Sequence, residues 1–233
     1  DALPIYAWTE INVPQRPFEI ENVDTVTVPL AQSGYTTEYL RYRITINDRP
    51  NETNYYRIVI DKQTTLWGYN HEEGGDDYIY WTKHSYNFIG REDVVLTDGQ
   101  PTTGDDEDNG LFDTAKNIYG VFDDTRFRNT SYTMTVYNNT KIETGSDSGY
   151  FSGMDVIIRL MSITETEYYY LKALNLVDSD AYDETINEPI KYPSNVHGGT
   201  GMVGISTEVT QTIHIISSSH SKGNLAPPVH VYQ

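Results

Sequence analysis

Alternation of apolar and polar side chains is the feature that most constrains the fold of this chain. In the segment YLRYRITIND (39–48), every second residue from Tyr42 to Ile46 is apolar, with Arg43 and Thr45 between them. A period of two places the apolar side chains on one face of a half-buried strand. The alternation resumes in NYYRIVID (54–61), after a run of turn-forming residues. This pair of segments predicts a β-hairpin.

Three later segments are also expected to be strands. They are SYTMTVYN (131–138), GMDVIIRLMSI (153–163) and QTIHIIS (211–217). Residues 155–163 are apolar at both alternating sets of positions, which predicts a central strand covered on both faces. The chain is therefore expected to be mainly β.

One helix is expected at about 164–177. Thr164 and Glu167 stand three residues apart and form a capping box at its start. A stripe expected to be buried follows at helical spacing: Tyr170, Leu171, Leu174 and Val177. The predicted fold is an antiparallel β-sandwich or open barrel with this single amphipathic helix.

The expected organisation is one domain with two flanking segments. Residues 1–37 are expected to be an N-terminal extension or linker, 38–216 the β-rich domain, and 217–233 an irregular tail. Between 68 and 112, glycine and carboxylates predict long exposed loops.

Charge and composition exclude several classes of partner. Lys and Arg number 16 against 34 Asp and Glu, so the formal net charge is −18. Nucleic acids and anionic membrane surfaces are therefore not expected partners. The chain contains no cysteine, which excludes disulfides and thiolate metal sites. It begins at Asp1 without a charged-then-apolar leader, and we expect any lipid anchor to lie outside it.

One acidic loop has the beginning of a calcium-binding pattern. Asp105, Glu107 and Asn109 precede Gly110 at a spacing similar to that of an EF-hand. The twelfth position, where a bidentate Glu belongs, is Lys116. We therefore expect a solvated acidic loop and no cofactor, with this loop as the place for calcium if the chain binds it.

The aromatic residues suggest a different kind of site. Twenty tyrosines are mostly explained by the fit of tyrosine to half-buried strands. Trp67 and Trp81 border the predicted loops, so they are the candidates for binding a glycan or peptide ligand.

Catalytic motifs are missing from the sequence. It holds no nucleophile elbow, phosphate-binding loop or dinucleotide fingerprint. We expect a non-catalytic module. A glycan-active enzyme with dispersed carboxylates stays open as an alternative, because such carboxylates meet in space rather than in sequence. A structural or adhesive surface protein is the third alternative.

Four segments, in order, resemble one known family. They are NETNYYRIVI (51–60), YGVFDDTRFRNTSYTMTV (119–136), LMSITETEYYYLKAL (160–174) and NEPIKYPSNVHGGTGMVGIS (187–206). Together they resemble the Bacteroidetes lipoprotein family called domain of unknown function 4249, over about residues 38–209. This chain departs from the family pattern at His197, Thr200 and Met202-Val203.

The resemblance implies a location and a partner. It implies lipid attachment to the outer membrane of a Gram-negative bacterium, and an accessory role beside a TonB-dependent transporter. The chain resembles the C-terminal domain of such lipoproteins, and the resemblance assigns no catalytic residue.

The glycine-rich stretch in the last segment is interpreted as structural. Gly198, Gly199 and Gly201 are expected to supply positive φ or close backbone approach as the chain turns into a strand at 202–206. A phosphate-binding role would need a helix to follow, and a strand is expected there instead.

Overall fold

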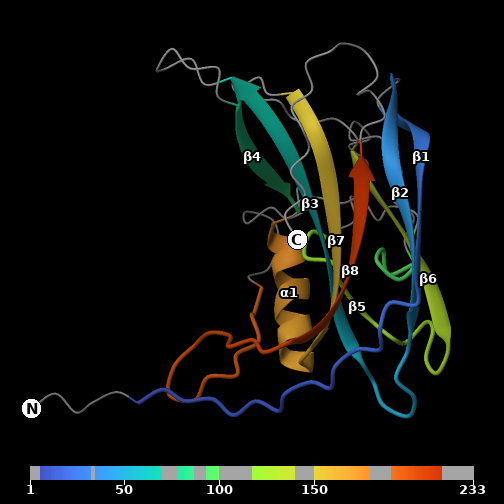
Figure 1. Ribbon diagram of the computed structural model, residues 1–233. Coiled ribbons are helices and arrows are strands. Elements are labelled where there is room, and N and C mark those ends of the chain that lie inside the picture. The colour runs from blue at the N-terminus through green and yellow to red at the C-terminus, as the bar shows by residue number, and fades with distance from the viewer. Residues whose placement is uncertain are drawn as a thin grey trace, which may run out of the picture. The chain divides into compact units, whose positions relative to one another are not determined.

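The computed structural model describes residues 6–32, 35–69, 78–86, 93–99, 117–139, 150–178 and 190–216. These residues form strands and one helix, as Figure 1 shows. In chain order the elements are β1 (Asn22–Gln32), β2 (Tyr35–Asn47), β3 (Tyr55–Tyr69), β4 (Tyr78–Ser85), β5 (Val121–Asp123), β6 (Ser131–Asn139), β7 (Tyr150–Ile163), α1 (Glu165–Val177) and β8 (Thr207–Ile216). Among these elements, no helix is long and apolar enough to cross a membrane.

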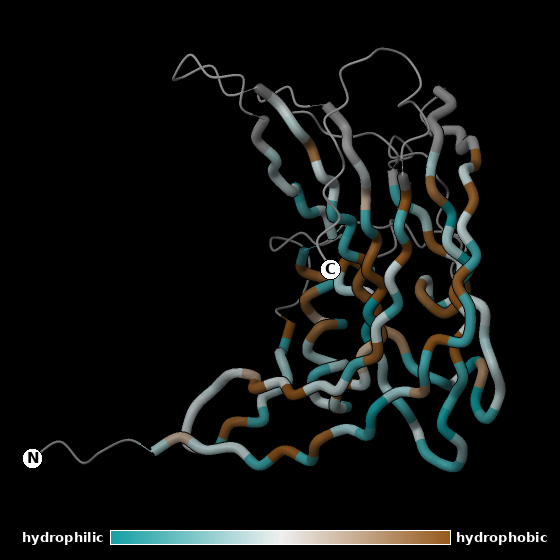
Figure 2. The backbone as a smooth tube through the Cα atoms, viewed as in Figure 1, coloured by the Kyte–Doolittle hydropathy of each residue, from teal (hydrophilic) through white to brown (hydrophobic). Residues whose placement is uncertain are grey.

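The first sheet has the order β1-β2-β6, and both of its pairings are antiparallel. The alternation in β2 has the predicted effect, since Tyr42, Ile44 and Ile46 are fully or almost fully buried. Figure 2 shows the corresponding alternation of hydrophobic and hydrophilic residues along the strands. β1 lies inside the extension predicted at 1–37, yet it pairs with β2 along its whole length, so residues 22–32 are part of the sheet.

The second sheet has the order β4-β3-β7-β8, with β5 also paired to β3. β3 pairs antiparallel with β4 and with β5. The predicted hairpin of 39–48 and 54–61 is therefore wrong, because β2 and β3 belong to different sheets. Alternation identifies a strand's buried face but not its neighbour, and both edges of β2 are taken by β1 and β6.

β7 has a neighbour on each side, as a central strand should. Its second face is less covered than predicted: Met154, Val156, Ile158 and Leu160 are buried, but Ile157 is only half-buried and Arg159 is exposed. A second difference is β4, a strand that lies within the segment 68–112 predicted to be loops. Its alternation of apolar and polar residues is short and is flanked by glycine and acidic residues, so the segment was interpreted as part of a loop.

The helix forms where it was predicted. The Thr164 side chain accepts a hydrogen bond from the Glu167 backbone N–H at 3.2 Å, which closes the N-terminal cap. The buried face is rotated from the predicted stripe: Tyr168, Leu171 and Asn175 are buried, whereas Tyr170 and Leu174 are half-buried. Tyr168 and Leu171 pack with Val121 and Ile163 into one hydrophobic cluster.

The described strands form two separate open sheets rather than one closed barrel, which confirms the mainly antiparallel β class and is consistent with the predicted sandwich. The chain divides into two compact units: residues 1–59, 87–140 and 158–211 form the first, and residues 60–86, 141–157 and 212–233 the second. In the first unit, Tyr56 of β3 stacks on Phe122, and Phe127 stacks on Tyr132 of β6.

Candidate functional site

The first unit contains a cavity of about 480 Å³. Three stretches of chain and one loop residue line it: the N-terminal segment 10–15, the turn 52–55 between β2 and β3, the junction 162–166 between β7 and α1, and Asn195. The four parts are far apart in sequence, so each wall needs its own anchor.

The N-terminal segment is anchored by backbone pairing. Trp8 and His197 exchange two backbone hydrogen bonds, of 3.1 and 2.8 Å, and their rings stack at 4.2 Å between centroids. Further along, the Thr207 hydroxyl donates to the Pro14 carbonyl at 3.2 Å, and the Arg16 guanidinium donates to the Glu208 carbonyl at 3.1 Å. Residues 10–15 are therefore held between two attachment points.

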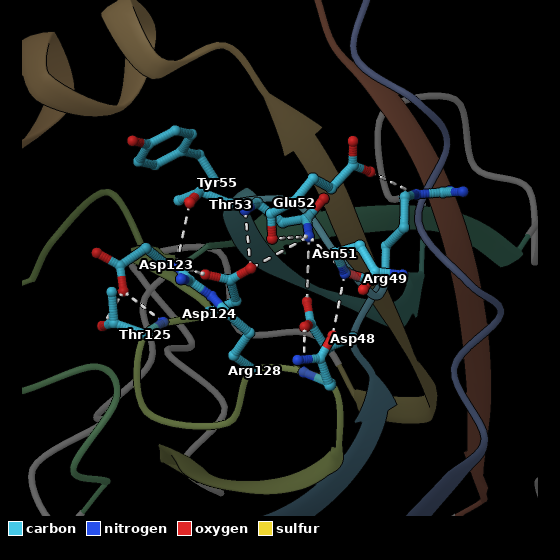
Figure 3. Close-up of polar contacts among 12 residues, drawn as sticks. Asp48, Arg49, Asn51, Glu52, Thr53, Tyr55, Asp123, Asp124, Thr125 and Arg128 are labelled. Carbon is cyan, nitrogen blue, oxygen red and sulfur yellow. Dashed lines mark hydrogen bonds and ion pairs between the residues drawn. The ribbon is translucent and has the colours of Figure 1, made fainter.

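The turn wall is held by two buried carboxylates, which Figure 3 shows at the centre of a polar network. Asp124 is fully buried and accepts hydrogen bonds from the Asn54 backbone N–H at 2.9 Å, the Asn54 amide at 3.1 Å and Arg128 at 3.1 Å. Asp48 accepts from the Tyr56 hydroxyl at 3.2 Å and from the Asn129 backbone N–H at 2.8 Å. These bonds fix residues 52–55 before any ligand arrives.

The third wall begins at the capped start of α1. The Tyr55 hydroxyl donates to the Glu165 carboxylate at 2.9 Å, which joins the turn wall to the helix wall. Burial, and then the neighbouring Glu165, raise the pKa of Tyr55 well above its ordinary value. Tyr55 is therefore a protonated hydrogen-bond donor throughout the physiological pH range.

Asn195 is positioned by its own side chain. Its amide donates to the Val203 carbonyl at 2.8 Å and accepts from the Val203 N–H at 2.9 Å. This reciprocal pairing closes the glycine-rich loop. The strand predicted at 202–206 does not form, since these residues have no strand structure and β8 begins at Thr207. The hydrogen-bonding groups of Val203 are satisfied by a side chain instead of by a neighbouring strand.

The predicted glycines differ from one another in this loop. Gly198 has a φ of 77°, and a Cβ there would collide with the Tyr6 carbonyl oxygen. Gly201 has a φ of 137° and faces open space. A Cβ on Gly199 would make only ordinary contacts of 3.5 and 3.7 Å. Glycine is therefore needed at Gly198 for both its φ and the close approach of the N-terminal segment, and at Gly201 for its φ alone.

The chemistry of the lining is polar and acidic. It contains the three glutamates Glu10, Glu52 and Glu165, and neither lysine nor arginine. Glu52 forms an ion pair with Arg49 at 3.3 Å, just outside the lining. Amide and hydroxyl groups supply the rest of the polar surface, so the lining suits a neutral polar or a cationic ligand better than an anion.

The two predicted binding tryptophans lie elsewhere, in the second unit, and do not meet. β3 and β4 pair Trp67 with Tyr80, and Leu66 with Trp81. Directly opposed residues share a face and successive residues alternate, so Trp67 and Trp81 are on opposite faces of the ribbon. They cannot form a single platform.

The predicted calcium ligands Asp105, Glu107 and Asn109 lie outside the described residues. Within the part of the chain that is described, no group of three potential metal ligands occurs.

Sequence reasoning missed the cavity, although two of its walls carried a signal. The capping box located the start of α1, and with it Glu165 and Thr166. The run of turn residues at 48–53 located a second wall. Nothing local indicated that these two segments lie beside each other or beside residues 10–15.

The fold and the site define a mainly antiparallel β protein with one capped helix and a polar cavity. The family model described as "Domain of unknown function (DUF4249)" matches residues 2–212, and the chain belongs to this family. The match includes the N-terminal segment that lines the cavity. No curated protein and no solved structure matches the chain.

Proposed function

We propose that this chain is a non-catalytic, ligand-binding module of a surface lipoprotein, accessory to a TonB-dependent outer-membrane transporter. The observation that carries the binding role is the cavity. Its volume of about 480 Å³ lies within the range of roughly 300–1,000 Å³ typical of small-molecule sites. The proposed location, lipid anchor outside this chain, Bacteroidetes source and transporter partner follow from the family resemblance.

Preorganised walls support binding. The turn wall is held by Asp48 and Asp124, the helix wall by the Thr164 cap, and the N-terminal wall by the pairing of Trp8 with His197. A site whose walls are already ordered avoids the entropic cost of ordering them upon binding. The ligand class that fits the lining is small, polar, and neutral or cationic.

Filling the cavity should abolish this binding. Thr166 lines the cavity, and Thr166→Trp places a bulky ring there. In a thermal-shift screen of sugars, short peptides and polyamines, at least one compound should stabilise the wild type. A ligand at 100 times its dissociation constant contributes about 2.7 kcal/mol, or roughly 5–10 °C for a chain of this length.

The matched control is Thr166→Ser, which should keep the shift. If no compound shifts the wild type, or if Thr166→Trp shifts as much as the wild type does, the cavity is not the ligand site.

Association with a transporter is tested separately. The full-length tagged lipoprotein, pulled down from gently solubilised outer membranes, should recover a TonB-dependent barrel in near-stoichiometric amount by mass spectrometry. Recovery of the lipoprotein alone would remove the transporter from the proposal and leave the cavity experiment unaffected.

A glycan-active enzyme is the alternative function, and the glutamates of the cavity are the observation in its favour. Glycoside hydrolysis needs two facing carboxylates, one of them an acid. Glu52 is paired with Arg49, and Glu165 accepts from the Tyr55 hydroxyl, so both carboxylates already have partners within the protein. This favours binding over hydrolysis. Release of reducing ends from a glycan would favour the alternative.

A further inference from the structure

The ribbon of β3 and β4 has one covered face and one open face. On the covered face Leu66 is 0% exposed and Thr64 is buried, and the Trp81 ring lies against Gly68, since a Cβ there would be 3.2 Å from it. Successive residues alternate between the faces, so Trp67 and its partner Tyr80 belong to the other side.

The open face carries exposed aromatic rings. Tyr80 is 50% exposed and Tyr86 57% exposed, and Trp67 is half-buried beside Tyr80. The rings of His84 and Tyr86 stack with centroids 6.1 Å apart and planes 20° apart. Water-facing positions of a strand ordinarily hold small polar or charged residues, so rings in this number indicate a contact surface.

A buried carboxylate orients the polar groups of this face. Asp61 is 6% exposed, accepts from the Gln63 amide at 2.7 Å, and lies 3.1 Å from the Nδ1 of His84. A proton on Nδ1 makes Nε2 the acceptor of the neutral ring. Asp61 thereby holds an amide and an imidazole in fixed orientations between the aromatic rings.

We propose that this open ribbon face, formed by Gln63, Trp67, Tyr80, Thr82, His84 and Tyr86 around Asp61, binds a neutral polysaccharide chain. Pyranose rings present C–H faces that pack on aromatic rings, and their hydroxyls pair with amide, imidazole and hydroxyl groups. The face shares no residue with the cavity, and the inference does not depend on the cavity being a ligand site.

Three properties favour a neutral glycan over other partners. At the alternating positions 61–67 and 80–86 that form the face, there is no lysine, arginine or aliphatic side chain, although protein interfaces are enriched in arginine. The net charge of −18 opposes an anionic polymer. From Tyr80 in β4 to Tyr86 just beyond it, an extended chain covers about 20 Å at roughly 3.3 Å per residue, which suits a polymer rather than a small molecule.

Affinity electrophoresis in native gels tests the proposal. The gels contain a neutral polysaccharide, namely β-glucan, xyloglucan, galactomannan, arabinoxylan or dextran. At least one should retard the full chain. Tyr80→Ala and Trp67→Ala should each raise the dissociation constant obtained from that retardation by about tenfold or more, and a tenfold change corresponds to about 1.4 kcal/mol of binding free energy. Asp61→Asn should weaken it less, because the amide still accepts one of the two bonds.

The matched control is Tyr169→Ala, since Tyr169 is 51% exposed on α1 in the other unit and should leave retardation unchanged. Circular dichroism and thermal melting confirm that each variant is folded, and Tyr80→Ala keeps the test valid if Trp67→Ala unfolds. The proposal is overturned if no polysaccharide retards the protein, or if both variants are retarded like the wild type. Thr166→Trp should be retarded normally, which separates this outcome from that of the cavity.

Discussion

Replacing Asp124 by alanine should lower the free energy of unfolding by about 3 kcal/mol, because loss of this buried acceptor leaves its hydrogen-bond donors unpaired. Asp124 is 0% exposed and serves both the backbone N–H and the side-chain amide of Asn54. Alanine removes these bonds and leaves a cavity that the rigid turn cannot close. Urea unfolding monitored by tryptophan fluorescence measures the loss, and the slope of the transition should not change.

Two further variants separate the contributions to this loss. Arg128 is 43% exposed, so Arg128→Ala removes a solvent-screened ion pair and should cost about 1 kcal/mol or less. Asp124→Asn keeps one acceptor oxygen but turns its NH2 group toward either the Arg128 donor or the Asn54 donors, so its loss should fall between the other two. An Asp124→Ala variant as stable as the wild type would show that the network in Figure 3 contributes nothing to the turn.

The local features of the fold could be predicted from the sequence, because their signals and their causes lie in the same few residues. Thr164 caps the helix by bonding to the N–H three residues later, and that spacing can be read directly. Alternation through Ile44 likewise identifies a buried face wherever the strand pairs.

Strand partners could not be predicted, because they depend on which edges remain available. The turn after β2 suggested a return to the same sheet. In the structure, Asp48 and Asp124 tie that turn to residues 124–129 instead, and the chain enters the other sheet as β3. Contacts that span about 70 to 80 residues have no local pattern to reveal them.

The candidate site likewise combines features that could be predicted from the sequence with features that could not. Trp67 and Trp81 were grouped because both border the predicted loops, but the register places them on opposite faces. No register could be inferred for β4, because that strand was not expected. The partner of Trp67 on the open face, Tyr80, follows from pairing alone, as does the pairing of Gln63 with His84. The cavity depends on packing of the N-terminal segment, which the sequence indicated only as an extension.

Replacing Gly198 by alanine should release that N-terminal segment. Its φ of 77° costs an alanine about 1–2 kcal/mol, and the new Cβ would collide with the Tyr6 carbonyl. The backbone bonds between Trp8 and His197 are two residues or fewer from the collision, so they should open. Hydrogen exchange of the peptide spanning 6–15 should accelerate at least about tenfold, since 1.4 kcal/mol is a factor of ten in the opening equilibrium.

The neighbouring glycine provides the control that isolates this cause. Gly199→Ala adds the same methyl group one residue away, where it meets only ordinary contacts, so exchange of 6–15 should stay as in the wild type. Because residues 10–15 line the cavity, Gly198→Ala should also weaken the binding of any ligand that the thermal-shift screen identifies, while Gly199→Ala should not. Equal exchange in both variants would mean that the pairing of Trp8 with His197 does not hold the segment. Other bonds would then have to hold the segment, and those of Thr9 to Asn195, Thr207 to Pro14 and Arg16 to Glu208 are available.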